Sequence, residues 1–309
     1  MAISNGYSRC MSEQFAQQLS RDLATAVAKT SPGLVFTRGR RGRAASGTIV
    51  DVQSIVVSEH LLDADQTIRV QTSNGDVDAR VIGRDAGTDI ALLQVDGSPL
   101  TPVSIASDPP AIGQMVMAVG RSWSGLVAYP GFVTQLSGPH HVWPGFRLEH
   151  AIHTTLEPFS GFSGGALVNG LGYVVGVSTS ALERGRGVAI PMADVSRVVE
   201  SLKKYGRLRR GYLGITSLPI SLPLRQRTDG SERGLLVTSV AADSPADRAQ
   251  VLVGDILVAI DGTPAKRPDD LAAHLTGERV GQVSVLHLVR GLQPVRLDVT
   301  VGERSADAG

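Results

Sequence analysis

The sequence contains one cysteine, Cys10, in 309 residues, and its aromatic residues make up only 4% of the chain. One cysteine cannot form an intramolecular disulfide or supply a multi-thiolate metal site. No stretch approaches the ~18 consecutive apolar residues of a transmembrane helix, so no membrane span is predicted. Neither sign of charge is in excess, with 30 Lys and Arg against 29 Asp and Glu. The balance argues against a nucleic-acid partner, because phosphate contacts need surplus basic residues.

The remaining composition is that of an ordinary globular protein. Hydrophobic residues account for 42% of the chain and charged residues for 19%, as in proteins that bury a packed core. At ~150 residues per domain, the length corresponds to about two domains. The 35 glycines indicate many tight turns and therefore many short strands.

The N-terminal segment, residues 1–30, predicts a helix rather than a secretion signal. A signal needs an uninterrupted apolar core of ~7–15 residues, and charged residues interrupt every candidate: Glu13, Arg21, Asp22 and Lys29. Apolar residues four apart favour a helix over residues 12–29. We expect it to pack on the body of the protein, with an oligomer contact or a regulatory arm as alternatives. A full-length chain of this kind would be cytoplasmic, whereas a chain trimmed of a signal would be periplasmic or exported.

Residues 31–206 predict a domain of short strands. β-branched runs such as Ser54–Ser58 recur along it, one further strand is expected at Arg147–Ile152, and Ser73–Asp76 is a strong hairpin signal. So many short strands indicate a β-barrel or sandwich. A helix is predicted at the end of the domain, over Asp194–Tyr205, because its apolar residues share one face.

A basic stretch flanked by glycines, Gly206–Gly211, separates this domain from a second one predicted at residues 211–303. Ser244 is a favourable helix N-cap followed by proline, and a second helix is expected from Pro268. Strands surround these helices, which predicts a small barrel. No cluster of residues indicates chemistry there, so a binding module is expected, followed by a loose tail at residues 304–309.

The motif Gly161–Gly165, with the sequence Gly-Phe-Ser-Gly-Gly, carries the sharpest signal of chemistry. Glycines on both sides let the hydroxyl of Ser163 stand clear and let backbone N–H groups converge, as an oxyanion hole requires. The nucleophile elbow of α/β-hydrolases has a similar pattern, but it lies between a strand and a helix. Here a strand, a turn and a strand follow Ser163, which disfavours that fold.

A second class of serine hydrolases, built on β-barrels, orders its triad as His, Asp and Ser along the chain. His60 follows the apolar run Ile55–Val57, and Asp89 precedes the strand Ile90–Leu93. An aspartate just before a buried strand is well placed to hold an imidazole in one tautomer. His60, Asp89 and Ser163 therefore stand in the order that this class requires.

At these motifs the chain resembles the HtrA (Deg) serine proteases, in which a trypsin-like protease domain precedes a PDZ domain. The resemblance covers roughly residues 30–303. It implies a mainly β fold, with a double β-barrel protease domain followed by a small α+β PDZ domain. The segments that carry it, in family order, are Ser46–Val50, Ser58–Leu62, Asp85–Val95, Gly161–Asn169, Gly187–Pro191, Arg210–Ile215 and Val253–Leu257.

The resemblance implies a serine endopeptidase that hydrolyses unfolded or exposed protein segments without ATP, metal or cofactor. Ser163 would be the nucleophile, His60 the general base and then acid, and Asp89 the residue that orients it. The N–H groups of Gly161 and Ser163 would form the oxyanion hole. Family members commonly form trimers, so a homotrimer is expected. The alternative is a catalytically weak or inactive binding or holdase protein on the same scaffold.

In the PDZ domain, the resemblance implies a loop whose N–H groups bind the terminal carboxylate of a peptide. The strand from Ile215 would pair with that peptide by β-augmentation, and apolar side chains of the following helix would receive its last residue. The alternative is a tethered spacer without a ligand. The residues concerned are Tyr212, Leu213, Gly214, Ile215, Leu271 and Leu275.

Three positions near the expected site depart from the family or leave alternatives open. Glu59 stands where the family usually has a small residue or asparagine. Phe162 puts a bulky ring beside the nucleophile, which questions whether the oxyanion hole is formed at rest. Glu157, six residues before Ser163, stands where trypsin-like enzymes have the base of the specificity pocket. A buried carboxylate there favours cleavage after Arg or Lys. A glutamate turned outward by Pro158, or neutralised by Arg184 or Arg186, favours Val, Ala or Ile.

Four histidines lie close together in the sequence, and histidine clusters can bind zinc. His150 and His153 would lie on opposite faces of a strand, and no cysteine assists. A surface hairpin without a metal is therefore predicted for this group: His140, His141, His150 and His153.

Overall fold

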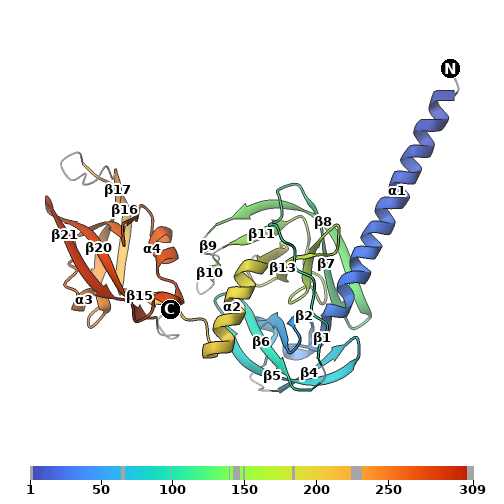
Figure 1. Ribbon diagram of the computed structural model, residues 1–309, viewed down its shortest axis with the longest axis horizontal. Coiled ribbons are helices and arrows are strands. Elements are labelled where there is room, and N and C mark those ends of the chain that lie inside the picture. Colours follow the sequence, from blue (N-terminus) through green and yellow to red (C-terminus); the bar gives the residue numbers. More distant parts are fainter. Residues whose placement is uncertain are drawn as a thin grey trace. The chain divides into compact units, whose positions relative to one another are not determined.

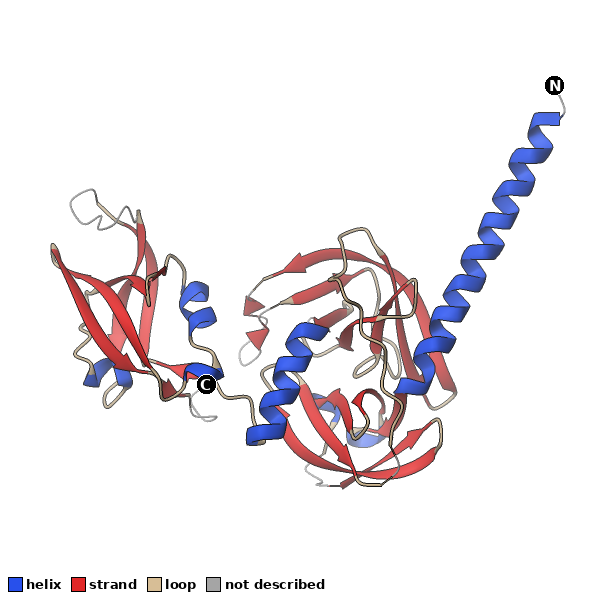
Figure 2. Ribbon diagram, viewed as in Figure 1, coloured by secondary structure: helices blue, strands red, loops and turns tan. Residues whose placement is uncertain are grey.

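The computed structural model describes residues 3–63, 67–97, 99–138, 140–141, 147–148, 150–182, 185–223 and 232–304. Contacts divide the chain into two compact units, Met1–Arg207 and Leu208–Gly309, shown in Figures 1 and 2. The first unit contains two closed β-barrels, and the second contains a six-stranded β-sheet, a two-stranded sheet of β15 and β22, and short helices. The prediction of a mainly β protein with a double barrel and a small α+β domain is confirmed.

The first barrel closes in the order β1-β2-β3-β6-β5-β4 around a core that includes Ile55 and Leu93. The predicted hairpin is confirmed, because β4 and β5 pair up to Thr72 and Gly75. Short 3-10 turns occur at Ser31–Gly33, Arg40–Gly42 and Glu59–Leu61. The strands are β1 (Leu34–Arg38), β2 (Ala44–Asp51), β3 (Ser54–Ser58), β4 (Thr67–Thr72), β5 (Gly75–Asp85) and β6 (Ile90–Val95).

The second barrel closes in the order β11-β14-β13-β12-β7-β8. Its core includes Ile152, Phe162 and Leu167. The two short strands β9 (His140–His141) and β10 (Arg147–Leu148) pair with each other outside it. The barrel strands are β7 (Met115–Ser122), β8 (Gly125–Ser137), β11 (Ala151–Thr154), β12 (Ala166–Asn169), β13 (Val174–Thr179) and β14 (Val188–Pro191).

The prediction of a single strand at Arg147–Ile152 is wrong, because this segment contributes to two separate strands, β10 and β11. The N–H group of His150 donates to the carboxylate of Asp194 at 3.1 Å. A backbone group that bonds to a side chain leaves the strand ladder at that residue. Pairing with the barrel therefore begins only at the buried Ala151.

Helix α2 (Met192–Tyr205) closes the first unit and contacts strands of both barrels. It begins two residues before the predicted Asp194. It ends at Gly206, whose φ of 70° is the left-handed conformation that favours glycine at a helix C-terminus. The helix thus braces the two barrels against each other from one side.

Helix α1 (Ile3–Thr30) is longer than predicted, and among its described side chains the buried ones lie near its C-terminal end. Ala26 is buried there, the hydroxyl of Thr30 donates to the Gly172 carbonyl, and the Lys29 ammonium lies over the Tyr173 ring. Phe15, by contrast, is 71% exposed. Phe15 is one of the apolar residues that were expected to pack on the body, and for Phe15 this expectation fails. The β12–β13 turn contacts residues near the C-terminal end of the helix. No helix in the described part of the chain is long and apolar enough to cross a membrane.

The second unit is a sheet in the order β16-β17-β18-β20-β21, with β16 at one edge. Its core includes Leu213, Leu257 and Leu286. Ser244 caps the first helix through its hydroxyl, as predicted. The elements are β15 (Gly211–Tyr212), β16 (Ile215–Ser221), β17 (Arg233–Val240), α3 (Pro245–Arg248), β18 (Ile256–Ile260), β19 (Thr263–Pro264), α4 (Pro268–His274), the 3-10 turn Gly277–Arg279, β20 (Val283–Arg290), β21 (Gln293–Thr300) and β22 (Gly302–Glu303).

Candidate active site

His60 and Asp89 meet at one edge of the first barrel. Strands β3 and β6 pair with Ser58 opposite Ile90, which brings the residues just beyond these ends together. His60 Nδ1 lies 2.8 and 2.9 Å from the two carboxylate oxygens of Asp89. The His60 backbone N–H donates to the same carboxylate at 2.9 Å. These contacts place the Nδ1 proton toward Asp89 and leave Nε2 available for a reacting group.

Asp89 receives a further hydrogen bond from the second barrel. The hydroxyl of Thr179, at the end of β13, donates to Asp89 Oδ2. Asp89 is only 2% exposed, and burying a polar group is costly unless hydrogen bonds satisfy it. The sequence analysis did not identify Thr179, since a threonine at the end of a β-branched strand carries no local signal of this contact.

The first barrel also anchors the loop that carries Ser163. The N–H of Ser46 on β2 donates to the Ser163 carbonyl at 3.1 Å, and the Ser46 hydroxyl donates to the Gly161 carbonyl at 2.5 Å. Gly164 has a φ of +81°, and a Cβ there would lie 2.0 Å from the Ser46 carbonyl oxygen. Glycine is therefore required at this position, because the two barrels approach each other at backbone distance.

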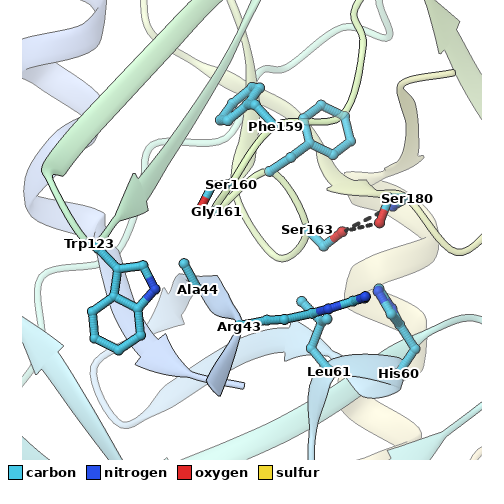
Figure 3. A pocket seen from close by; sticks show the side chains of 11 residues that line it. Arg43, Ala44, His60, Leu61, Trp123, Phe159, Ser160, Gly161, Ser163 and Ser180 are labelled. Atoms are coloured by element: carbon cyan, nitrogen blue, oxygen red, sulfur yellow. Dashed lines mark hydrogen bonds between the residues drawn. The ribbon is translucent and has the colours of Figure 1, made fainter. Parts of the chain in front are cut away.

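The Ser163 hydroxyl bonds to Ser180, and within the described residues no hydrogen bond joins it to His60. The two serine hydroxyl oxygens lie 2.8 Å apart, and the Ser180 N–H donates to Ser163 Oγ at 3.0 Å (Figure 3). Ser163 and His60 nevertheless line the same cavity of about 360 Å³. The structure therefore brings the three predicted catalytic residues together, with the serine turned to a partner that the sequence analysis missed.

The backbone N–H groups next to the Ser163 hydroxyl differ in whether they have an acceptor. Phe162 N–H donates to the Phe159 carbonyl at 2.9 Å. The N–H groups of Gly161 and Ser163, by contrast, meet no protein acceptor among the residues that the structure describes. Gly161 has a φ of +86° and borders the cavity. Two free N–H groups beside the serine are what binding of an oxyanion requires.

Phe162 packs inward, although its position beside Ser163 suggested an obstruction. The side chain is 2% exposed and belongs to the core of the second barrel. Its ring meets Phe159 edge-on at 5.3 Å, and Phe159 stacks on Tyr129 at 4.2 Å. The ring thus forms part of the cavity wall and continues into the barrel core.

Glu157 is exposed and is not among the residues that line the cavity. Of its two possible partners, Arg186 is exposed, whereas Arg184 lies outside the described residues. The apolar residues that line the cavity include Phe159, Phe162 and Trp123.

Glu59 lies next to the pair of His60 and Asp89 without a bond to the imidazole among the described contacts. Its backbone N–H donates to the Asp89 carbonyl at 3.2 Å. Partial burial, followed by the negative charge of Asp89, raises the pKa of the Glu59 carboxyl above its ordinary value.

Of the four histidines that are close together in the sequence, His150 and His153 have described side chains, and each bonds to its own partner. His150 Nδ1 lies 3.1 Å from Asp194 Oδ2, and His153 Nε2 lies 2.8 Å from the Ser137 hydroxyl. Across the described part of the chain, no three His, Cys, Asp or Glu side chains are grouped as a metal site.

In the second unit, the predicted peptide-binding residues lie around edge strand β16. Gly214 has a φ of +85° and directly precedes β16, which begins at Ile215. Leu213 and Leu271 are buried in the core, and Leu275 packs against it at the end of α4. Tyr212 lies in β15. The outer side of β16 pairs with no other described strand.

Comparisons with known proteins agree with this architecture. Residues 45–177 match the model of a trypsin-like peptidase domain, and residues 211–301 match that of a PDZ domain. The chain is 30% identical over 277 residues to serine endoprotease DegS of Escherichia coli K12, covering 84% of this chain and 77% of DegS. It is 32% identical over 275 residues to periplasmic serine endoprotease DegP of the same strain, covering 84% of this chain and 57% of DegP.

Solved structures of the same kind superpose over most of the chain. The HtrA-type protease AlgW with a tripeptide has a TM-score of 0.79 at 25% identity, covering 93% of this chain and 99% of AlgW. A serine endoprotease from Yersinia pestis has a TM-score of 0.75 at 28% identity, covering 92% of this chain and 98% of that one.

Proposed function

This chain belongs to the HtrA (Deg) family and is a serine-type endopeptidase, and we propose that it cleaves unfolded or exposed protein segments with His60, Asp89 and Ser163. The observation that carries the assignment is the hydrogen-bonded pair of the buried Asp89 and the partly exposed His60, which lines one cavity with Ser163. Neither nucleotide nor metal takes part in this chemistry, because the imidazole and the backbone N–H groups supply the proton transfer and charge stabilisation.

In the proposed reaction, the Ser163 hydroxyl leaves Ser180 and turns to His60 Nε2. His60 accepts its proton as the oxygen attacks the scissile carbonyl, and Asp89 stabilises the imidazolium that forms. The N–H groups of Gly161 and Ser163 bind the developing oxyanion, and loss of one such donor typically costs ~10²–10³ in turnover. His60 then gives the proton to the leaving amine, and water releases the acyl group by the same steps.

Degradation of casein, an unfolded protein, in a buffer without nucleotide and with a chelator tests this proposal. Ser163→Ala should reduce the rate by about 10⁴–10⁶-fold. The matched control is Ser160→Ala, an exposed serine of the same loop. Equal, slow degradation by the wild type and Ser163→Ala would remove the enzyme assignment to these residues.

We further propose that cleavage follows small aliphatic residues such as Val, Ala or Ile. The support is that Glu157 is exposed, while apolar rings line the cavity. Profiling of the cleavage sites on a denatured proteome should give the same aliphatic preference for the wild type and Glu157→Ala. Cuts after Arg and Lys that disappear in Glu157→Ala would instead make Glu157 the base of the specificity pocket.

The PDZ domain is proposed to bind peptide C-termini along β16. Three features support this: the open edge of β16, the left-handed Gly214 before it, and the apolar Leu271 of α4. Titration of the full-length Ser163→Ala protein with paired free-acid and amidated peptides tests it. The free acid should bind at least tenfold more tightly, whereas equal affinities would remove the carboxylate loop.

A homotrimer is proposed on the basis of the family. Exposed aromatic side chains on β8, Tyr129 at 48% and Phe132 at 47%, are compatible with a contact between copies. Light scattering at micromolar concentration should give three times the chain mass of 32.5 kDa, and a monomer would contradict this.

An extracytoplasmic location is proposed because DegP and DegQ of E. coli are named periplasmic proteases. Fractionation of the host cells with an antibody against the chain should recover it outside the cytoplasm. Recovery with cytoplasmic markers would favour the other expectation.

A further inference from the structure

Four arginines lie at the end of β1 and in the segment that joins it to β2, and one of them, Arg43, lines the active-site cavity. They fall within the six residues 38–43, and all four are exposed, although the net charge of the whole chain is only +1. The 3-10 turn Arg40–Gly42 folds this segment back on itself. Positive charge is therefore concentrated in one short segment of a chain whose total charge is balanced. The four residues are Arg38, Arg40, Arg41 and Arg43.

The arginines differ in what they contact. Arg40 lies 3.9 Å from Asp63, with both side chains more than half exposed. The Arg38 guanidinium lies 5.0 Å from the centre of the Trp123 ring. Arg43 has no acidic partner among the residues that the structure describes. Its charge is therefore available to a bound molecule.

Arg43 also lines the catalytic cavity itself. Arg43 directly precedes β2. In Figure 3 its side chain points toward the His60 ring, below Ser163. Trp123 and Gly161 line the same cavity, and no Asp or Glu is among the lining residues. An arginine in a partly enclosed groove without a carboxylate attracts an anionic group more strongly than one in open solvent.

The position of His60 indicates which part of a substrate meets Arg43. His60 protonates the leaving amine, so the fragment that departs begins beside the imidazole. Because the Arg43 side chain points to that ring, it lies within reach of the first side chains after the scissile bond. Residues before the scissile bond belong to the acyl part, which stays on Ser163.

We propose that Arg43 selects substrates with Asp or Glu at the first or second position after the scissile bond. The inference rests on the proposed function, because it takes its direction from the roles of His60 and Ser163. Arg43 is here a specificity-determining residue that contacts the leaving fragment, with Trp123 forming the apolar side of the same groove.

The test uses internally quenched peptides that differ only at these two positions, with Asp or Glu in one series and Asn or Gln in the other. The full-length wild type should show a kcat/KM about three- to tenfold higher for the acidic series, the range expected for one partly exposed ion pair. Arg43→Gln should abolish the difference, and Arg43→Glu should favour Lys over Asp at the same positions. Arg40→Gln is the matched control, since it removes the same charge from the 3-10 turn directly before Arg43.

The outcomes separate this inference from the proposed function. Equal rates for the two series in the wild type would overturn it, and so would an equal loss of preference in Arg43→Gln and Arg40→Gln, since that indicates a diffuse field. If the wild type cleaves no peptide, the proposed function fails. The inference about Arg43 is then tested by measuring the binding of the acidic and neutral peptides. Ser163→Ala should bind the acidic peptides more tightly, and Ser163→Ala with Arg43→Gln should not. Unfolding midpoints near that of the wild type would show that the exposed substitutions leave the fold intact.

Discussion

The two barrels present their parts of the active site in different states. The first barrel holds His60 and Asp89 already paired, with both carboxylate oxygens within 2.9 Å of Nδ1. The second barrel holds Ser163 in hydrogen bonds to Ser180. In the proposed mechanism, the acid–base half is therefore assembled before substrate arrives, while the proposed nucleophile has to exchange a partner.

This difference follows from where the hydrogen bonds come from. Asp89 is buried and bonded by groups from both barrels, so it has little freedom to move. The Ser163 backbone is fixed by Ser46, but its hydroxyl rotates about one side-chain bond, and staggered rotamers interconvert readily. A fixed base and a rotatable nucleophile allow an intact site to rest without its final hydrogen bond.

The substitution Asp89→Asn, which disrupts the pair of His60 and Asp89, should have the largest effect on kcat. The amide cannot stabilise the imidazolium and favours the wrong tautomer of His60, so kcat should fall by about 10³–10⁴-fold. Steady-state kinetics on a fluorogenic peptide measures this. Asp76→Asn, an exposed residue of the β4–β5 hairpin, controls for the same chemical change. A fall of less than tenfold would show that the pair is not used in catalysis.

Thr179→Val tests the contribution of the second barrel to the first. It removes one hydrogen bond to the Asp89 carboxylate and keeps the side-chain shape, and a bond to a charged group supports about a tenfold loss in kcat/KM. Thr179→Ser, which keeps the hydroxyl, should retain most of the activity. If Thr179→Ser loses as much as Thr179→Val, packing rather than the hydrogen bond explains the loss.

Ser180→Ala tests the resting state of the nucleophile. It removes the hydroxyl that competes with His60 for Ser163, and one neutral hydrogen bond corresponds to a rise of about two- to fivefold in kcat/KM. Ser178→Ala, in the adjoining strand β13, is the control, because the buried Ser178 hydroxyl has no hydrogen-bond partner among the described residues. A decrease in Ser180→Ala would mean that Ser180 supports attack.

Glu59→Gln tests whether the negative charge of Glu59, beside the paired His60 and Asp89, lowers the stability of the fold. The pKa of Glu59 is raised by burial and then by Asp89, so the folded protein holds this proton more tightly than the unfolded chain. Stability therefore falls as pH rises through the ordinary range of glutamate and the raised pKa. Glu59→Gln should increase the free energy of unfolding at neutral pH by less than about 1 kcal/mol, since the group is partly exposed.

Urea unfolding at two pH values measures this last effect. The gain in Glu59→Gln should vanish below about pH 4, where glutamate is protonated in both states. A gain of equal size in acid would assign it to packing rather than to charge.

Features that depend on neighbouring residues could be predicted from the sequence. The hairpin at Ser73–Asp76, the helix that ends at Gly206 and the N-cap Ser244 each depend on local backbone preferences. The glycines around Ser163 and the order of His60 and Asp89 before it identified the candidate triad. These signals persist in the sequence because turns, caps and glycine conformations are properties of a few consecutive residues.

Only the tertiary structure decided which long-range partners these residues have. Thr179 and Ser180 lie within hydrogen-bond reach of Asp89 and Ser163 because two barrels close against each other. The same packing buries Phe162, leaves Glu157 exposed and brings Arg43 to the catalytic cavity. The direction of a side chain depends on the space left by residues far away in the chain, and periodicity or spacing contains no record of that space.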